Sequence, residues 1–117
     1  MHLRIALAQV FDVPIDTIDR VIVIEQSRFA RLHGPQVTAT TRKNAIYLSG
    51  SGNAFVSDFE LLVHEYFHVV RQWNAGSLTV MRYLRESILR GFRRNRFEVE
   101  ACDFTRERVI EFAALLA

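Results

Sequence analysis

The sequence predicts a single α+β domain over residues 1–117, with a short β-sheet placed before a set of longer helices. Three observations indicate this fold class. β-branched runs fill much of the chain before Gly52, apolar residues at helical spacing follow it, and no linker-like segment divides the two parts. With 117 residues, of which 50% are apolar, the chain can bury one hydrophobic core.

The expected elements before Gly52 are short. Apolar residues at helical spacing predict a first helix over residues 3–11, and Pro14 disfavours its continuation through the preceding residue. The β-branched run at residues 20–26 predicts a buried strand. Residues 27–34 should form one or two helical turns that end at a glycine.

Two strand-like runs come next, at residues 36–41 and 44–50, and a short polar segment joins them. This arrangement predicts a β-hairpin. We expect its second strand, which contains the sequence NAIYL, to form an edge of the sheet.

Three helices are expected in the second half of the chain. Ser57 and Glu60 have the spacing of a capping box, which predicts a central helix that runs to Trp73 before the NAG segment ends it. Residues 77–91 predict a second helix. Asn95 marks the start of a third helix, which continues nearly to the C-terminus.

The segment LLVHEYFHVV places His64, Glu65 and His68 within the otherwise apolar central helix. Two histidines four residues apart lie one turn from each other and can direct two nitrogens at one point. The H-E-x-x-H pattern is typical of a catalytic zinc site, in which the glutamate takes a proton from water. The competing interpretation is a pair of core histidines and a salt-bridged glutamate. Because the match falls in an apolar helix, the zinc site is favoured.

A catalytic zinc site needs a third protein ligand. The candidates are Glu86, Glu98, Glu100, Cys102, Asp103, His2 and His33. Glu98 is preferred because Ala101, which is small, would let its helix approach the central one. If Glu100 faced the metal instead, Phe104 would hold the two helices apart. The alternative role for Glu98 is a capping box with Asn95.

HEYFH, followed later in the chain by FEVEA, resembles the two motifs of the gluzincin metallopeptidases. The size and layout are closest to the minigluzincins, and the second motif is also similar to that of ImmA/IrrE-type and HtpX-type peptidases. The resemblance implies a zincin-like fold, one zinc ion per chain, and peptide-bond hydrolysis by a metal-activated water. It also implies that an edge strand, here NAIYL, binds extended substrate. Cys102 departs from the family pattern, which has Asp or Asn at that place.

Side chains near the expected site are candidates for further roles. Tyr66, Tyr83 and His33 could each stabilise an oxyanion. Substrate preference would come from side chains around Phe55, Tyr66 and Tyr83. The single cysteine, Cys102, cannot form an internal disulfide and is expected to be a small core residue.

Basic charge is concentrated in one stretch, which contains Arg82, Arg85, Arg90, Arg93, Arg94 and Arg96. Such a stretch is usually a solvated face, although it could contact nucleic acid, an acidic membrane surface or an acidic protein. The alternative function is therefore a weak or inactive zincin-fold binding module that docks through these arginines. The sequence shows no spanning apolar run and no cleavable leader, so a cytoplasmic location is expected. It does not indicate the oligomeric state.

Overall fold

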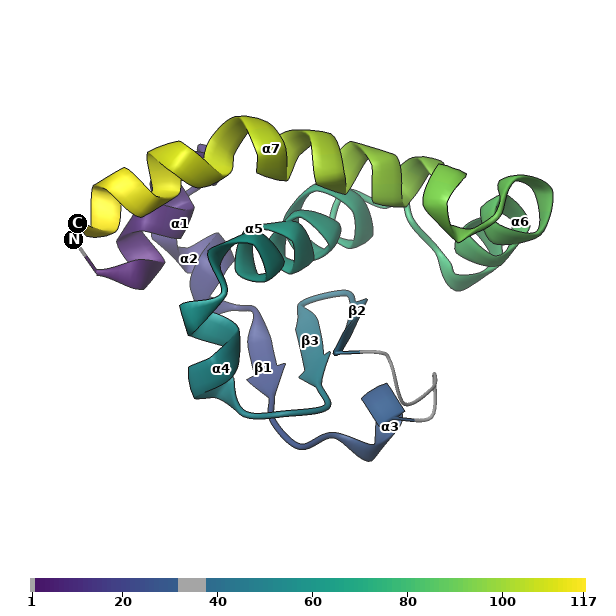
Figure 1. Cartoon of the computed structure of the whole chain (residues 1–117), viewed down its shortest axis with the longest axis horizontal. Helices are drawn as coiled ribbons and strands as arrows, with labels where there is room; N and C mark the ends of the chain where they lie inside the picture. The colour runs from purple at the N-terminus through teal and green to yellow at the C-terminus, as the bar shows by residue number, and fades with distance from the viewer. Residues whose placement is uncertain (1, 32–37) are drawn as a thin grey trace.

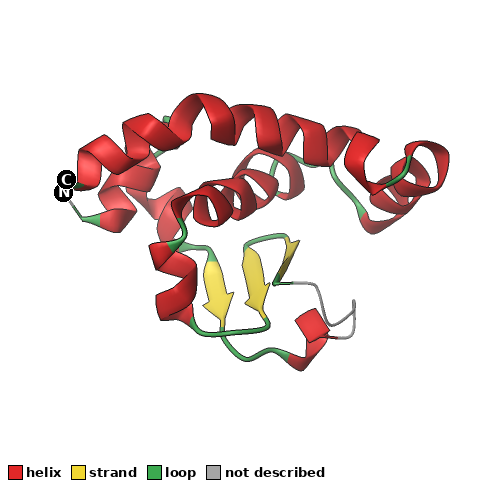
Figure 2. Cartoon of the chain, viewed as in Figure 1, coloured by secondary structure: helices red, strands yellow, loops and turns green. Residues whose placement is uncertain are grey.

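The long C-terminal helix α7 (Arg96–Leu116) packs against the central helix α5 (Phe59–Phe67), and a three-stranded sheet lies on the other side of α5 (Figure 1). This computed structural model describes residues 2–31 and 38–117. Figure 2 shows the two helices α5 and α7 above the strands, with both termini at the same end. The prediction of a small α+β domain is confirmed. Within the described ranges, no helix is long and apolar enough to cross a bilayer.

The N-terminal segment forms α1 (Leu3–Phe11), α2 (Ile15–Asp19), β1 (Ile22–Ile24) and α3 (Arg28–Arg31). Helix α1 ends at Phe11 as predicted, and the next residue, Asp12, adopts a left-handed conformation with φ 53°. Helix α2 was not predicted, because its five residues are too few to show helical periodicity.

Strand β1 was predicted to be buried, and this prediction is wrong. Ile22 is 62% exposed and Ile24 is 38% exposed. The strand lies at one side of the sheet, where its alternate side chains point to solvent and only Val23 packs against the core.

Strands β2 (Ala39–Arg42) and β3 (Ala45–Leu48) form the predicted hairpin. The sheet order is β1-β3-β2, with β3 parallel to β1 and antiparallel to β2. The prediction that NAIYL is an edge strand is therefore wrong, because β3 is paired on both sides. Hairpin spacing shows that two strands are neighbours but not where a third strand pairs. Of the hairpin strands, β2 is the one that lies at an edge of the described sheet.

The central helix begins after α4 (Gly52–Ser57). Its N-cap is Asp58 rather than Ser57, because the Asp58 carboxylate accepts a hydrogen bond from Leu61 N at 3.1 Å. The Ser57 hydroxyl instead donates to Asn53 O at 2.8 Å. The helix continues from α5 as the π-helical segment η1 (His68–Trp73), so its predicted end at Trp73 is confirmed.

The next helix, α6 (Val80–Arg90), starts later than predicted because the Thr79 hydroxyl caps it, accepting from Arg82 N at 3.1 Å. Gly91, with φ 78°, ends it before the 3-10 turn η2 (Phe92–Arg94). No residue of α6 is buried. Helix α6 projects at the end of the molecule opposite both termini (Figure 1).

The hydrophobic core fixes α5 between α1, α7 and β3. It includes Leu7, Phe11, Ile46, Leu62, Val63 and Phe112. Phe104 of α7 stacks on Phe11 with ring centroids 4.8 Å apart, and it also contacts Phe67. Phe55 and Tyr66, two of the residues expected to select substrate, belong to this core rather than to a cleft. These contacts cover the other faces of α5. The face that bears His64, Glu65 and His68 therefore points toward β2 and the start of α7.

Candidate metal centre

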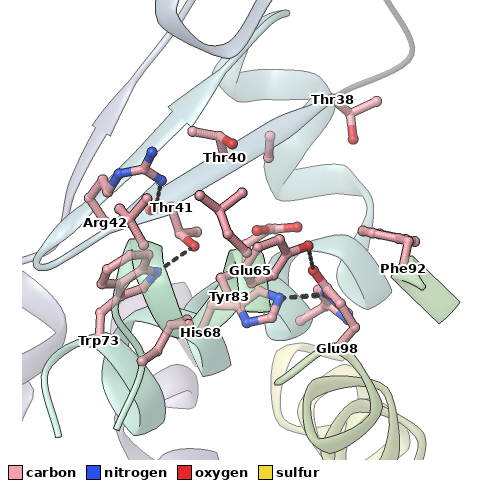
Figure 3. A pocket seen from close by; sticks show the side chains of 15 residues that line it. Thr38, Thr40, Thr41, Arg42, Glu65, His68, Trp73, Tyr83, Phe92 and Glu98 are labelled. Carbon is pink, nitrogen blue, oxygen red and sulfur yellow. Dashed lines mark hydrogen bonds and ion pairs between the residues drawn. The ribbon is translucent and has the colours of Figure 1, made fainter. Parts of the chain in front are cut away.

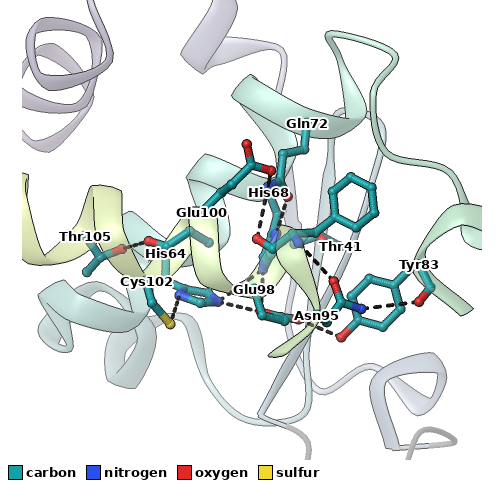
Figure 4. Close-up of polar contacts among 12 residues, drawn as sticks. Thr41, His64, His68, Gln72, Tyr83, Asn95, Glu98, Glu100, Cys102 and Thr105 are labelled. Carbon is teal, nitrogen blue, oxygen red and sulfur yellow. Dashed lines mark hydrogen bonds and ion pairs between the residues drawn. The ribbon is translucent and has the colours of Figure 1, made fainter. Parts of the chain in front are cut away.

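Two imidazole nitrogens meet where α5 passes into η1. His64 Nε2 and His68 Nε2 are 3.1 Å apart, and the two rings are nearly perpendicular, at 81°. This pairing follows from the four-residue spacing, which places both side chains on one helical face. Both rings therefore direct a nitrogen at the same point, as the sequence predicts (Figure 4).

Glu98 supplies the third atom from the first turn of α7. Its Oε1 lies 3.0 Å from His64 Nε2 and 3.0 Å from His68 Nε2. Around a tetrahedral zinc ion, ligand atoms at roughly 2.0–2.1 Å from the metal are about 3.3–3.4 Å from one another. If each of the three ligand atoms moved a few tenths of an ångström farther from the other two, the cluster would fit such an ion. His64, His68 and Glu98 form a cluster that could hold a metal ion.

The close approach of α7 to α5 depends on the residues around Glu98. Ala101, one turn later, is completely buried. Asn95 caps α7 by accepting from Phe97 N at 2.9 Å, while its side-chain amide donates to Tyr83 O and Ser87 Oγ. The Glu98 carboxylate is directed at the histidines rather than back to Asn95, so the capping-box alternative does not describe its side chain.

The other candidates for the third ligand lie elsewhere or have other partners. Glu86 accepts from Arg96 N at 3.1 Å, and Asp103 pairs with Arg106 at 3.2 Å. His2 is exposed ahead of α1, and His33 lies outside the described residues. Glu100 Oε1 accepts a hydrogen bond from Gln72 and does not belong to the cluster. Cys102 Sγ neighbours His64 Nδ1, which is not the ring nitrogen that meets His68 and Glu98.

Gln72 is a site residue that the sequence reasoning missed. It is 2% exposed, and its Oε1 accepts a hydrogen bond from His68 Nδ1 at 2.6 Å. Its amide nitrogen donates to Phe97 O at 3.0 Å and to Glu100 Oε1 at 3.3 Å. The contact with His68 keeps a proton on Nδ1, so Nε2 would be the nitrogen that offers its lone pair to a bound metal. The sequence signal that could have indicated this role is the position of Gln72 four residues after the second histidine, one helical turn from it.

The second nitrogen of His64 has a weaker neighbour. Cys102 Sγ lies 3.9 Å from His64 Nδ1. The gluzincin motif that the sequence resembles has Asp or Asn at this position. A thiol is a poor hydrogen-bonding group. Cys102 is exposed, so the expectation of a small core cysteine is wrong. The two histidines are therefore oriented unequally, firmly at His68 and weakly at His64.

The charge of Glu98 is stabilised by its contacts. Burial alone would raise the pKa of Glu98, but hydrogen bonds from His64 and His68, with a smaller effect from Tyr83, lower it well below its usual range. Tyr83 Oη donates to Glu98 Oε2 at 2.6 Å. Burial and the Glu98 carboxylate raise the pKa of Tyr83, so the hydroxyl remains a donor. The carboxylate is thus ionised with one oxygen directed at the two imidazoles.

Glu65 lies beside the cluster without belonging to it. The residue is 9% exposed, and no described residue donates a hydrogen bond to its carboxylate. Burial raises the pKa of Glu65, and the neighbouring His68 and His64 oppose this shift. A raised pKa brings a carboxyl group closer to the range in which it can both accept and donate a proton.

A cleft of about 560 Å³ opens onto this cluster (Figure 3). Thr38 and strand β2 form one wall, and apolar side chains form the opposite one: Leu78, Val80, Leu84 and Phe92. Of the three predicted oxyanion-stabilising residues, Tyr83 lines this cleft and Tyr66 does not. A second cavity of about 470 Å³ shares His64 and Glu65 with the first, so open space continues on both sides of the site.

Comparison with protein-family models, with curated protein sequences and with solved structures finds no match for this chain.

Proposed function

We propose that this protein is a zinc-dependent peptidase with a zincin-like fold. The observation that carries the proposal is the convergence of two imidazole nitrogens and one carboxylate oxygen, from two helices, beside a buried glutamate that faces a cleft. Two histidines with one carboxylate form a ligand set used by catalytic zinc sites, which keep a further position open. His64, His68 and Glu98 would hold one zinc ion per chain.

Zinc bound there would supply Lewis-acid chemistry, activating water and polarising the scissile carbonyl. Glu65 acts as general base in this proposal. Its carboxylate takes one proton from the attacking water as the oxygen–carbon bond forms, and it then transfers that proton to the leaving nitrogen as the carbon–nitrogen bond breaks. The position of Glu65 between the two cavities supports this role, because substrate lying in both would pass across its carboxylate.

Substrate binding is proposed along β2. Ser49 N donates to Thr38 O, so the backbone of Thr38 is hydrogen-bonded to β3. In an antiparallel pair only every second residue bonds to the neighbouring strand, so the backbone N–H and C=O groups of Ala39 and Thr41 point away from β3. Arg42 donates to the outward Thr41 carbonyl at 2.7 Å. The outward N–H and C=O of Ala39 then suit an extended peptide that adds to the edge of the sheet. The apolar wall across the cleft favours an apolar substrate side chain.

The variant Glu65→Gln tests the proposal. It keeps the size of the side chain but cannot accept a proton from water. The purified variant should retain zinc, measured by elemental analysis, and lose cleavage of casein and of quenched fluorescent peptides. If both proteins bind zinc and neither cleaves any substrate, the alternative applies, in which the chain is an inactive binding module that docks through its arginine-rich face.

A further inference from the structure

Helix α6 and turn η2 expose an unusual amount of apolar surface. Of the thirteen large hydrophobic residues that are exposed in the described ranges, six fall within residues 80–92: Val80, Met81, Leu84, Ile88, Leu89 and Phe92. Ile88 alone is 83% exposed. Because no residue of α6 is buried, packing within the fold does not explain these side chains.

Most of these residues share one face of α6. Val80, Leu84 and Ile88 are four residues apart, and Met81 lies beside them, so they form a stripe along the helix. Phe92 extends the apolar surface into η2. Helix α6 projects from the body of the molecule (Figure 1), and the exposure of these side chains leaves the stripe open to solvent.

Basic charge accompanies the stripe. Residues 80–96 contain six arginines and one glutamate, a net charge of +5. The whole chain has a net charge of +2, so the residues outside 80–96 have a net charge of −3, which is +2 minus +5. The one glutamate, Glu86, is engaged with Arg90 and with Arg96 N. Arg85, Arg93 and Arg94 are exposed and form no ion pair with any described residue.

We propose that this region, the α6 patch, binds an anionic lipid surface. The patch comprises Met81, Leu84, Ile88, Leu89, Phe92, Arg85, Arg93 and Arg94. A helix with an apolar stripe and arginine-rich flanks inserts its apolar side chains at the headgroup boundary, while its cations contact acidic headgroups. Aliphatic side chains add little to nucleic-acid binding, which relies on cations and stacked aromatic rings. The combination of aliphatic stripe and unpaired arginines therefore favours lipid.

The position of the patch has a consequence for the cleft. Leu84 and Phe92 belong to the patch and also line the cleft wall. Docking of α6 on a bilayer would place the cleft mouth beside the lipid surface. The lipid proposal itself stands on α6 and η2, so it does not depend on peptidase activity.

Vesicle co-sedimentation of the full chain tests the proposal. The protein should bind vesicles of equal parts phosphatidylglycerol and phosphatidylcholine, and not vesicles of phosphatidylcholine alone. Binding should weaken as salt is added, because the electrostatic part is screened. Absence of binding to the anionic vesicles at low salt would overturn the proposal.

Matched variants separate the patch from the rest of the surface. Ile88→Gln should weaken vesicle binding by about tenfold, whereas Ile110→Gln, at a residue 78% exposed on α7, should leave it unchanged. The double variant Arg93→Gln/Arg94→Gln should weaken vesicle binding by about tenfold or more. The double variant Arg20→Gln/Arg28→Gln, which changes the net charge equally, should have less effect. Circular dichroism checks that each variant is folded.

Three results would overturn the lipid proposal. One is equal vesicle binding by Ile88→Gln and Ile110→Gln. A second is a dimer, detected by light scattering, that Ile88→Gln dissociates. The third is tight binding to a mixed-sequence oligonucleotide that the arginine double variant loses and Ile88→Gln retains.

Discussion

Gln72 Oε1 accepts a hydrogen bond from His68 Nδ1 at 2.6 Å, one turn along the same helix. The amide group of Gln72 also donates to Phe97 O, close to Glu98. One buried side chain therefore orients a histidine of the cluster and ties its helix to the helix that carries the carboxylate. Such contacts around a metal site set the histidine tautomer and commonly affect metal affinity.

Replacing Gln72 with leucine should weaken zinc binding by about tenfold to a hundredfold, because His68 loses the acceptor that fixes its proton on Nδ1. Competition with a chromophoric chelator measures the affinity. Thr105→Val is the control, since it removes a buried hydrogen bond to Ala101 O without touching the cluster. Equal zinc affinities for the two variants would show that Gln72 has only a structural role.

Replacing one histidine of the cluster should abolish the stabilisation of the folded protein by zinc. Zinc at about a hundredfold excess over its dissociation constant should raise the melting temperature of the wild-type protein by about 10 °C, because it binds only the folded state. His64→Ala should show no such rise, and Glu65→Gln should show the full rise. Differential scanning fluorimetry with and without zinc measures both, and a rise in His64→Ala would remove His64 from the ligand set.

Glu98 and Glu100 offer a direct comparison on one helix. Glu98→Gln should weaken zinc binding by about tenfold to a thousandfold, because an amide oxygen is a poorer ligand than a carboxylate. Glu100→Gln should have almost no effect, since Glu100 contacts Gln72 and not the histidines. Isothermal titration with zinc distinguishes them, and the reverse order of affinities would contradict the proposed ligand set.

Edge-strand binding predicts a specific sensitivity in the substrate. In a set of peptides that each carry one N-methyl group, methylation at one position near the scissile bond should raise KM by about tenfold, because one hydrogen bond to Ala39 is lost. Methylation several residues away should have no effect. Steady-state kinetics over the set would reject binding along β2 if no position near the bond is sensitive.

Local signals allowed much of this structure to be predicted. The spacing of His64 and His68 sets their relative placement within a helix, so their convergence follows from sequence. The choice of Glu98 over Glu100 follows from the small Ala101 at the helix contact. Strand order depends instead on long-range pairing, and no local pattern distinguishes β3 at the centre from β3 at an edge. Gln72 was missed because a buried glutamine acquires its role only through three-dimensional partners.

The absence of buried side chains on α6 has a consequence for hydrogen exchange. Its polar contacts with the body run from Asn95 to Tyr83 O and Ser87 Oγ, from Arg96 N to Glu86, and from Tyr83 Oη to Glu98. Elements with few buried contacts open at a small fraction of the global unfolding free energy. The amides of α6 should therefore exchange rapidly by local opening, while those of α5 exchange only when the whole domain unfolds. One wall of the cleft is therefore formed by a helix that is expected to open locally, whereas His64 and His68 lie on the helix that is expected to exchange only through global unfolding.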